Sequence, residues 1–190
     1  MNKEDLNITS GVAEADSKVM TITTRSQRVE FYIAGAAKVK WNDDFEIETH
    51  YLLWFDKEGK PYRVRHNYDY AIPFEDKESV HTITITGENV THLVRMRKHI
   101  RTIDASDNTA LEVLECKYNW VKALDVSGCT AIRRINCSFN QLSADALNAL
   151  FETLHENTFP DCDKIIAVFG NPGSKECDRS IAERKGWEVK

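Results

Sequence analysis

The chain has 190 residues, with 25 Lys or Arg and 30 Asp or Glu, so its formal net charge is −5 at pH 7. A chain of this length can bury one sizeable core or two small ones, and its acidic balance argues against a nucleic-acid partner, which would need clustered Lys and Arg. The odd count of five cysteines, without a C-x-x-C pair, disfavours a disulfide framework and a four-cysteine zinc site.

The first half of the chain shows the alternation of apolar and polar residues that is typical of strands. Residues 1–18 are polar and lack this alternation, so they are predicted to be a flexible tail. No amphipathic helix pattern precedes residue 143, and residues 19–86 are therefore predicted to form a small β-sandwich domain. The predicted strands are 20–23, 29–33, 50–56, 62–66 and 81–87.

The second half repeats with a period of 21 residues, in blocks that begin at Val90, Leu111 and Ile132. Apolar residues and one asparagine recur in phase. Each block is predicted to form one coil, with a short strand that pairs in parallel with the strand of the next coil. The asparagine ends that strand and is expected to bond turn backbone groups with its side chain. The matching pairs are Leu111 with Ile132, Leu114 with Ile135, Cys116 with Cys137, and Asn119 with Asn140.

From Ser143 onward the repeat changes character. Ser143 is a candidate N-cap for a helix over residues 143–157, whose apolar positions have helical spacing. The segment from Lys164 to Asn171 restores the strand-and-asparagine spacing, so Asn171 joins Asn119 and Asn140 as a third ladder residue. A second helix is predicted over residues 177–186, ending at Gly186, and residues 187–189 are expected to close the open end of the core.

Residues 111–129 resemble the coils of bacterial surface-type leucine-rich repeat proteins, L-x-x-L-x-C-x-x-N-x-L-x-x-L-D-V-S-x-C. The resemblance covers residues 87–190. It implies an α+β fold in which a short solenoid of about four coils, with parallel strands and a C-terminal helical cap, follows the β-sandwich. Residues 41–44 and the strand at 82–87 look like a degenerate polycystic-kidney-disease or immunoglobulin-like module. The family implies recognition of a protein or glycan, and no catalysis.

The first block departs from this motif. Arg95 and Lys98 stand where Cys116 and Asn119 stand in the next block. The first coil is therefore either edge-like or shifted by one residue.

Residues that alternate outward from the parallel strands are predicted to form a ligand-binding face, with Tyr118 and Phe139 following at the strand ends one coil apart. Exposed aromatic rings beside a mixed set of charges are typical of recognition surfaces. The alternative is that these rings merely cover the edge of a short solenoid. The predicted face is Val113, Glu115, Lys117, Tyr118, Arg134, Asn136, Ser138, Phe139, Ala167 and Phe169.

Catalytic and metal-binding patterns are weak by comparison. Cys116 and Cys137 occupy the inward apolar position of the repeat, where free cysteine acts as a small hydrophobe, although thiolates on adjacent coils could also bind metal. Pairing of Cys162 with Cys177 stays open. Residues 170–175 lack the glycine spacing of a phosphate loop. The sequence therefore predicts no enzyme, no cofactor and no metal.

The main hypothesis is a non-catalytic module that binds a protein or glycan on its sheet face. The alternative is a structural spacer or oligomerisation element whose contacts are made by the N-terminal β domain. The first twenty residues lack the apolar segment of a signal peptide, and no stretch is apolar enough to span a membrane. The compartment is open: cytoplasmic, or cell-surface or extracellular if a leader has been removed.

Overall fold

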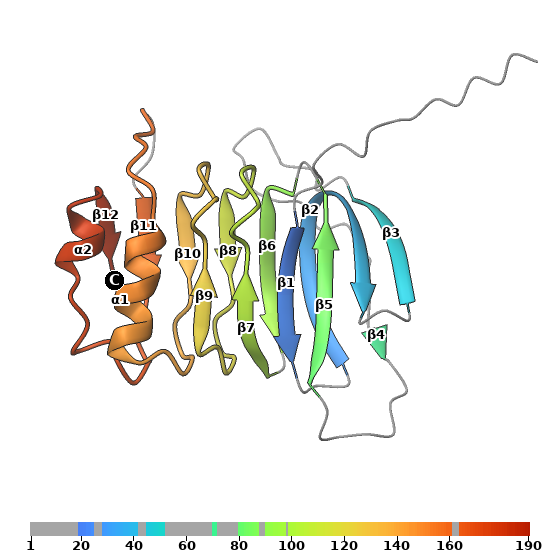
Figure 1. Ribbon diagram of the computed structural model, residues 1–190, viewed down its shortest axis with the longest axis horizontal. Coiled ribbons are helices and arrows are strands. Elements are labelled where there is room, and N and C mark those ends of the chain that lie inside the picture. The colour runs from blue at the N-terminus through green and yellow to red at the C-terminus, as the bar shows by residue number, and fades with distance from the viewer. Residues whose placement is uncertain are drawn as a thin grey trace, which may run out of the picture.

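The computed structural model describes residues 19–24, 28–41, 45–51, 70–71, 80–87, 90–97, 99–160 and 164–190. Figure 1 shows its strands side by side in a row, with both helices at the C-terminal end. The strands are β1 Val19–Thr24, β2 Arg28–Trp41, β3 Phe45–Tyr51, β4 Tyr70–Ala71, β5 His81–Thr86, β6 His92–Arg97, β7 Ile100–Asp104, β8 Val113–Glu115, β9 Ala123–Asp125, β10 Arg134–Asn136, β11 Lys164–Ala167 and β12 Trp187–Val189. The helices are α1 Ala144–Thr153 and α2 Ser180–Glu183.

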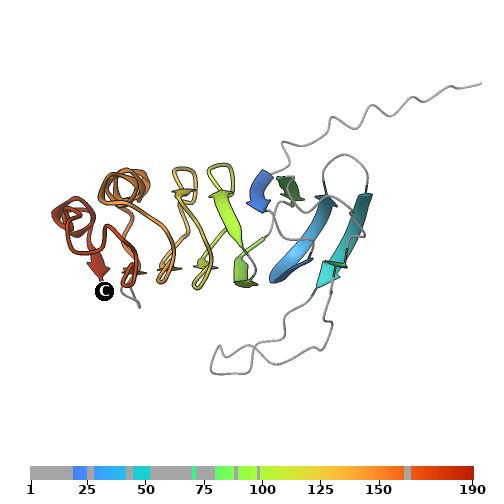
Figure 2. The same ribbon diagram turned by 90° about the horizontal axis from the view of Figure 1, so that it is seen from below.

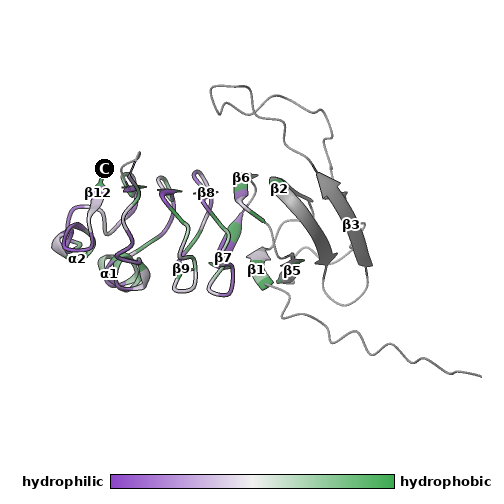
Figure 3. Cartoon of the chain, turned by 90° about the horizontal axis from the view of Figure 1, so that it is seen from above, coloured by the Kyte–Doolittle hydropathy of each residue, from purple (hydrophilic) through white to green (hydrophobic). Residues whose placement is uncertain are grey.

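The long strand β2 connects two arms of β-sheet. In the first arm β2 pairs antiparallel with β6, and β6, β8, β10, β11 and β12 follow as parallel neighbours. In the second arm β2, β5, β1 and β7 pair antiparallel, and β7 pairs in parallel with β9. Residues 30–34 of β2 serve the first arm and residues 38–41 the second. Figure 3 shows β6, β8 and β12 along one side of the molecule and β1, β7 and β9 along the other.

From β6 onward each coil runs once through both sides. The first two coils place a strand on each side, β6 with β7 and then β8 with β9. In the next two coils a helix takes the second position, so that α1 follows β10 and α2 follows β11. Both helices lie on the side of β7 and β9, and Figure 2 shows the coils stacked next to one another.

The first coil is shifted by one residue within its strand. His92 and Leu93 pair with Val113 and Leu114, in phase with the 21-residue period. Met96, one position after Arg95, is buried, and its carbonyl oxygen accepts a hydrogen bond from the Asn119 side chain. The shift thus places an apolar residue inward where the strict period would place an arginine, because burying an unpaired guanidinium is costly.

The buried apolar side chains of the described residues form one cluster rather than the two separate cores that the sequence suggested. It extends from Met20, Ile22 and Ile85 to Phe151 and Trp187 at the opposite end. The cause is the pairing of β1 with both β5 and β7, which continues the second arm from the N-terminal strands into the repeats. Residue 87 is therefore a boundary in the sequence pattern alone. The core and both arms of the sheet continue from the N-terminal strands into the repeats.

Several strand predictions agree with the described elements, and some bounds differ. The predicted strands 20–23, 29–33 and 81–87 fall in β1, β2 and β5, but β2 continues to Trp41. Of the predicted strand 50–56, the first two residues end β3. Residues 1–18 and 52–69, and with them the predicted tail and the strand at 62–66, lie outside the described residues.

Helix α1 begins where Ser143 predicts it. The Ser143 hydroxyl accepts a hydrogen bond from the N–H of Ala146 at 3.2 Å, and Leu147, Leu150 and Phe151 face the core. The helix ends at Thr153, before the predicted residue 157, because Leu154 adopts an extended conformation. The second helix is also shorter than predicted, with four residues, and is followed by Gly186 at φ 77°.

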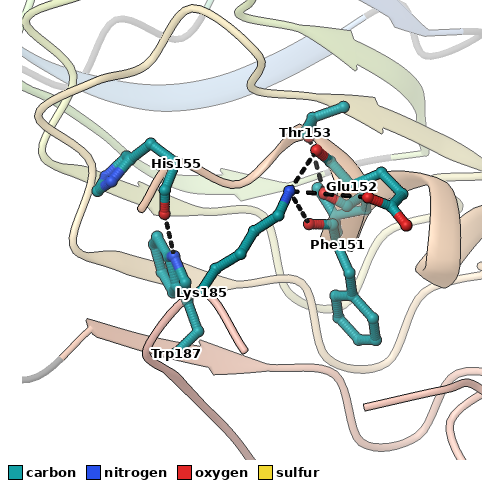
Figure 4. A network of polar contacts seen from close by, with 7 residues as sticks. Phe151, Glu152, Thr153, His155, Lys185 and Trp187 are labelled. Carbon is teal, nitrogen blue, oxygen red and sulfur yellow. Dashed lines mark hydrogen bonds and ion pairs between the residues drawn. The ribbon is translucent and has the colours of Figure 1, made fainter. Parts of the chain in front are cut away.

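Polar contacts fasten the C-terminal segment to the end of α1 (Figure 4). The Lys185 ammonium donates to the carbonyl oxygens of Phe151 at 3.3 Å and Glu152 at 2.6 Å, and it lies 3.8 Å from the Glu152 carboxylate. A cation at the last turn of a helix satisfies carbonyl groups and complements the helix dipole. Trp187 is buried beside it, and its indole N–H donates to the His155 carbonyl oxygen at 3.0 Å.

Gly128 allows the loops after β7 and β9 to touch. A Cβ atom at this position would lie 1.5 Å from the carbonyl oxygen of Ser106, which is backbone and cannot swing away. The glycine is therefore required by space and not by a left-handed conformation.

We expect Gly128→Ala to lower the free energy of unfolding by about 1–3 kcal/mol, since the Ser106 backbone must move to admit the methyl group. Urea denaturation measures this change. The neighbouring exposed Ser127→Ala is the control and should stay within about 0.5 kcal/mol of the wild type. Equal stability of the two variants would contradict the close approach.

Candidate functional site

The register of the first arm places five of the predicted face residues on neighbouring strands. Val113 pairs with Arg134, and Glu115 pairs with Asn136, which pairs in turn with Ala167. Arg134 is exposed and the other four are half-buried. These residues form two adjacent rows across β8, β10 and β11.

Backbone hydrogen bonds continue this register beyond the strand ends. The N–H of Tyr118 donates to Ser138 O at 3.1 Å, and the N–H of Phe139 donates to Phe169 O at 2.9 Å. A third row therefore contains Lys117, Ser138 and Phe169. Lys117 and Phe169 are exposed, but Ser138 is fully buried and its hydroxyl has no hydrogen-bond partner. The prediction that Ser138 belongs to an open face is wrong, because being in an outward row does not prevent neighbouring side chains from covering so small a residue.

Three aromatic rings form a continuous exposed ridge, which we call the aromatic ridge: Tyr118, Phe139 and Phe169. The rings of Tyr118 and Phe139 stack with centroids 4.5 Å apart and planes at 6°, and Phe169 meets Phe139 edge to face at 5.0 Å. Their residue exposures are 63%, 40% and 49%. A large part of their apolar surface thus faces solvent even though the rings contact one another.

The backbone under two of these rings is in the left-handed region. Tyr118 has φ 60° and Phe139 has φ 54°, where bulky residues are rare. The equivalent position in the next coil is Gly170, with φ 73°. A Cβ on Gly170 would lie 2.5 Å from the Phe139 ring, so the absent side chain makes room for that ring. Phe139 is consequently packed between Tyr118 on one face and the Gly170 backbone on the other.

His99 and Trp120 form a second stacked pair, which the motif of the repeats does not predict. Their ring centroids are 4.0 Å apart with planes at 29°, and Trp120 is 46% exposed. The two residues are one 21-residue period apart, so the repeat places them on neighbouring coils. The irregular first block obscures this placement, because its strand is locally shifted.

The charged side chains on the outward rows and at the start of β8 and β10 are of both signs. Arg133 and Glu112, one period apart, form an ion pair on the surface, where such pairs contribute about 1 kcal/mol at most. The side chains of Glu115, Lys117 and Arg134 make no hydrogen bond or ion pair with other parts of the described chain. They are available to a polar ligand. Burial lowers the pKa of His92, which pairs with Val113 in the adjoining strand, with Glu112 opposing the shift.

The three ladder asparagines each bond their own coil and the preceding one. Asn119 accepts from Ile100 N–H at 3.3 Å and donates to Met96 O at 2.7 Å and Cys116 O at 3.0 Å. Asn140 makes the same contacts one coil further, with Val121 N–H, Cys116 O and Cys137 O. Asn171 repeats them with Leu142 N–H, Cys137 O and Val168 O. Each side chain satisfies buried backbone groups at a turn, which would otherwise cost free energy.

Three cysteines lie in the core. Cys116, Cys129 and Cys137 are buried, and burial raises the pKa of Cys116, and raises that of Cys129 and Cys137 to about 12. Cys177 is half-buried, and Cys162 lies outside the described residues, so their pairing stays open. Within the described ranges no three His, Cys, Asp or Glu side chains gather in a way that could hold a metal ion. Neither of the helices found there has the length and apolar character to cross a bilayer.

Comparison of the chain with models of known protein families, with curated proteins and with solved structures gives no match.

Asn119→Ala should lower the free energy of unfolding by about 1–3 kcal/mol, because the Ile100 N–H and the Met96 carbonyl lose a buried partner. Denaturant titration measures the loss. Gln141→Ala, which removes an exposed amide in the next turn, should have almost no effect. A loss below a few tenths of a kcal/mol for Asn119→Ala would contradict its bridging role.

Alkylation by iodoacetamide should distinguish the cysteines, since the thiolate is the reactive form and burial suppresses it. We expect Cys177 to be labelled in the folded protein, and Cys116, Cys129 and Cys137 only after denaturation. Peptide mass mapping over time measures each site. Labelling of Cys137 at the rate of Cys177 would show that the coils open more readily than their packing indicates.

Proposed function

We propose that residues 87–190 form leucine-rich repeat coils that act as a non-catalytic recognition module, binding a protein or glycan on the aromatic ridge and the adjoining rows. The observation that carries this proposal is the placement of two large, exposed, stacked aromatic residues at left-handed backbone positions. The internal 21-residue period and the asparagine contacts between coils support the family resemblance.

Stacking alone does not account for Tyr118 and Phe139. A left-handed conformation costs about 1–2 kcal/mol for a residue with a side chain. Stacking of an aromatic pair contributes about 0.5–1.5 kcal/mol beyond the burial of ring area, which does not offset the backbone cost at two positions. Asparagine or glycine would meet the backbone requirement more cheaply, as Gly170 does one coil further. Strained residues of this kind cluster at functional sites, and a ligand that covers the rings would supply the missing free energy.

The polar surroundings of the ridge fit recognition as well. Lys117 is next to Tyr118 in the chain, and Glu115 and Arg134 lie in the outward rows before the rings. None of the three side chains makes a hydrogen bond or ion pair with the described chain. Aromatic anchors supply binding free energy, and unpaired polar groups around them supply direction and specificity. This combination suits a ligand that has both apolar and hydrogen-bonding surface.

The double variant Tyr118→Asn with Phe139→Asn tests the proposal. Asparagine tolerates the left-handed backbone, so the midpoint of thermal unfolding should stay near the wild-type value or rise. Capture of ligands on an array of glycans and of proteins should be lost. Arrays and thermal denaturation on the full chain measure the two effects.

Lys122→Ala is the matched control, since Lys122 is exposed beside β9, on the opposite side of the coils from the strands that the ridge follows. It should capture the same ligands as the wild type. Unchanged capture by the double variant would exclude the ridge as the binding site. Ridge-dependent self-association in light scattering, without any other ligand, would favour an oligomerisation element.

A further inference from the structure

His155 stands at the junction of three segments at the C-terminal end of the coils. It follows α1, and its ring meets Phe159 and Trp187 edge to face, with centroids 5.8 Å and 5.6 Å away. Its carbonyl oxygen accepts the Trp187 indole N–H at 3.0 Å and the Lys164 ammonium at 3.4 Å. Figure 4 shows the Trp187 contact beside the Lys185 contacts that close this end.

The hydrogen bonds of the ring determine where its proton is. The Asn157 N–H can only donate, and it donates to Nδ1 of His155 at 3.1 Å, so Nδ1 carries no proton. The proton is on Nε2, which donates to Ile132 O at 2.6 Å. Both ring nitrogens are therefore engaged in the neutral form, and there is no position for a second proton without breaking a contact.

The same short segment is attached to the coils at a second point. The Asn157 side chain donates to Thr130 O at 2.9 Å, and Ile132 and Thr130 both belong to the turn before β10. Loss of the bond between Asn157 and the His155 ring therefore affects the attachment of residues 155–159 to the third coil as well as the closing strand β12.

The charged groups on the segments that pack near His155 come from five parts of the chain: the end of α1, the turn before β10, β11, the residues after α2, and β12. Lys164 of β11 bonds the His155 carbonyl, and Lys185 after α2 is held by the end of α1 and by Glu152. Glu156 is the next residue in the chain. On the remaining sides, Arg133 beside Ile132 is paired with Glu112, and Glu188 of β12 is paired with Lys190. Asp161 and Asp163 lie outside the described residues.

We propose that His155 is an acid-operated latch for the C-terminal closure. Protonation of Nδ1 removes the acceptor of the Asn157 N–H and sets two N–H groups against each other, while Nε2–H keeps its bond to Ile132 O. Asn157 therefore turns away from the ring, its side chain releases Thr130 O in the third coil, and the displaced segment loosens the indole of Trp187. The effector is the proton, and the responding element is the junction of α1, residues 155–159 and β12.

The direction of the pH dependence follows from the environment of the ring. Burial lowers the pKa of His155, the bond to Ile132 O opposes this, and the nearby Lys164 ammonium lowers the pKa further. A His with a lowered pKa in the folded state binds fewer protons than the unfolded chain between the two pKa values. The closure is therefore most stable above about pH 6.5 and weakens as the pH falls through the folded-state pKa.

Hydrogen exchange on the full, ¹⁵N-labelled chain tests the latch. We expect the opening equilibrium at the Asn157 amide and the Trp187 indole N–H to rise between about pH 7.5 and about pH 5, by up to about tenfold for each unit by which the pKa is lowered. The backbone amides of β8 and β10, the strands of the second and third coils, should keep their protection against exchange.

His155→Gln removes the titration and can keep a donor for Ile132 O, so the pH-dependent opening should disappear. His92→Gln is the control, because the pKa of His92 is also lowered by burial but His92 lies in β6 at the far end of the coils. In that variant the opening should persist. The same opening in His155→Gln as in the wild type would assign it to another group and overturn the proposal.

A measurement on the wild type alone decides the case where His155→Gln does not fold. Ring ¹⁵N shifts should report a proton on Nε2 and an unprotonated Nδ1 at about pH 7.5. A proton on Nδ1 at that pH, or an opening equilibrium at the Asn157 backbone N–H and the Trp187 indole N–H that does not change with pH, would overturn the latch.

Discussion

The structure depends on one recurring contact, the side chain of the asparagine that follows each of the strands β8, β10 and β11. At these turns the chain leaves one side of the molecule for the other, so backbone N–H and C=O groups are buried without a sheet neighbour. Asn119, Asn140 and Asn171 supply both a donor and an acceptor, and each of them bonds the coil before it as well as its own. Because one side chain bonds backbone groups of two adjacent coils, it fixes the position of each coil relative to the one before it. This brings the outward rows and the aromatic ridge into register.

The 21-residue period carried most of what could be predicted from the sequence. It gave the partners of β8 and β10, the inward positions of Cys116 and Cys137, and the spacing of Tyr118 and Phe139, because each of these follows from the phase alone. The first coil departs from this phase by one residue, so that Met96 and not Arg95 takes the inward position. The period does not predict this shift, because it depends on how β6 pairs with β8.

Other features depend on contacts that no local pattern records. The alternation in residues 29–33 predicts a strand, but it does not say that β2 continues to Trp41 and pairs with β6 in one half and β5 in the other. Ser138 has the phase of an exposed residue and is nevertheless fully buried, which the period alone does not predict. The role of His155 rests on the direction of one N–H of Asn157, which is set by the path of the chain after α1.

Each coil contacts only the adjacent coils, and this affects how the number of coils can change. β8 contacts the coils on either side, while the N-terminal end is formed by β2 and the C-terminal end by β12 and the helices. Duplication or loss of a 21-residue block between β8 and β10 would therefore lengthen or shorten the ridge by one ring without altering either end, since each repeat interacts with its nearest neighbours alone. Duplication or deletion of repeats is thus a direct route by which a chain of this kind can change the number of rings in its exposed ridge.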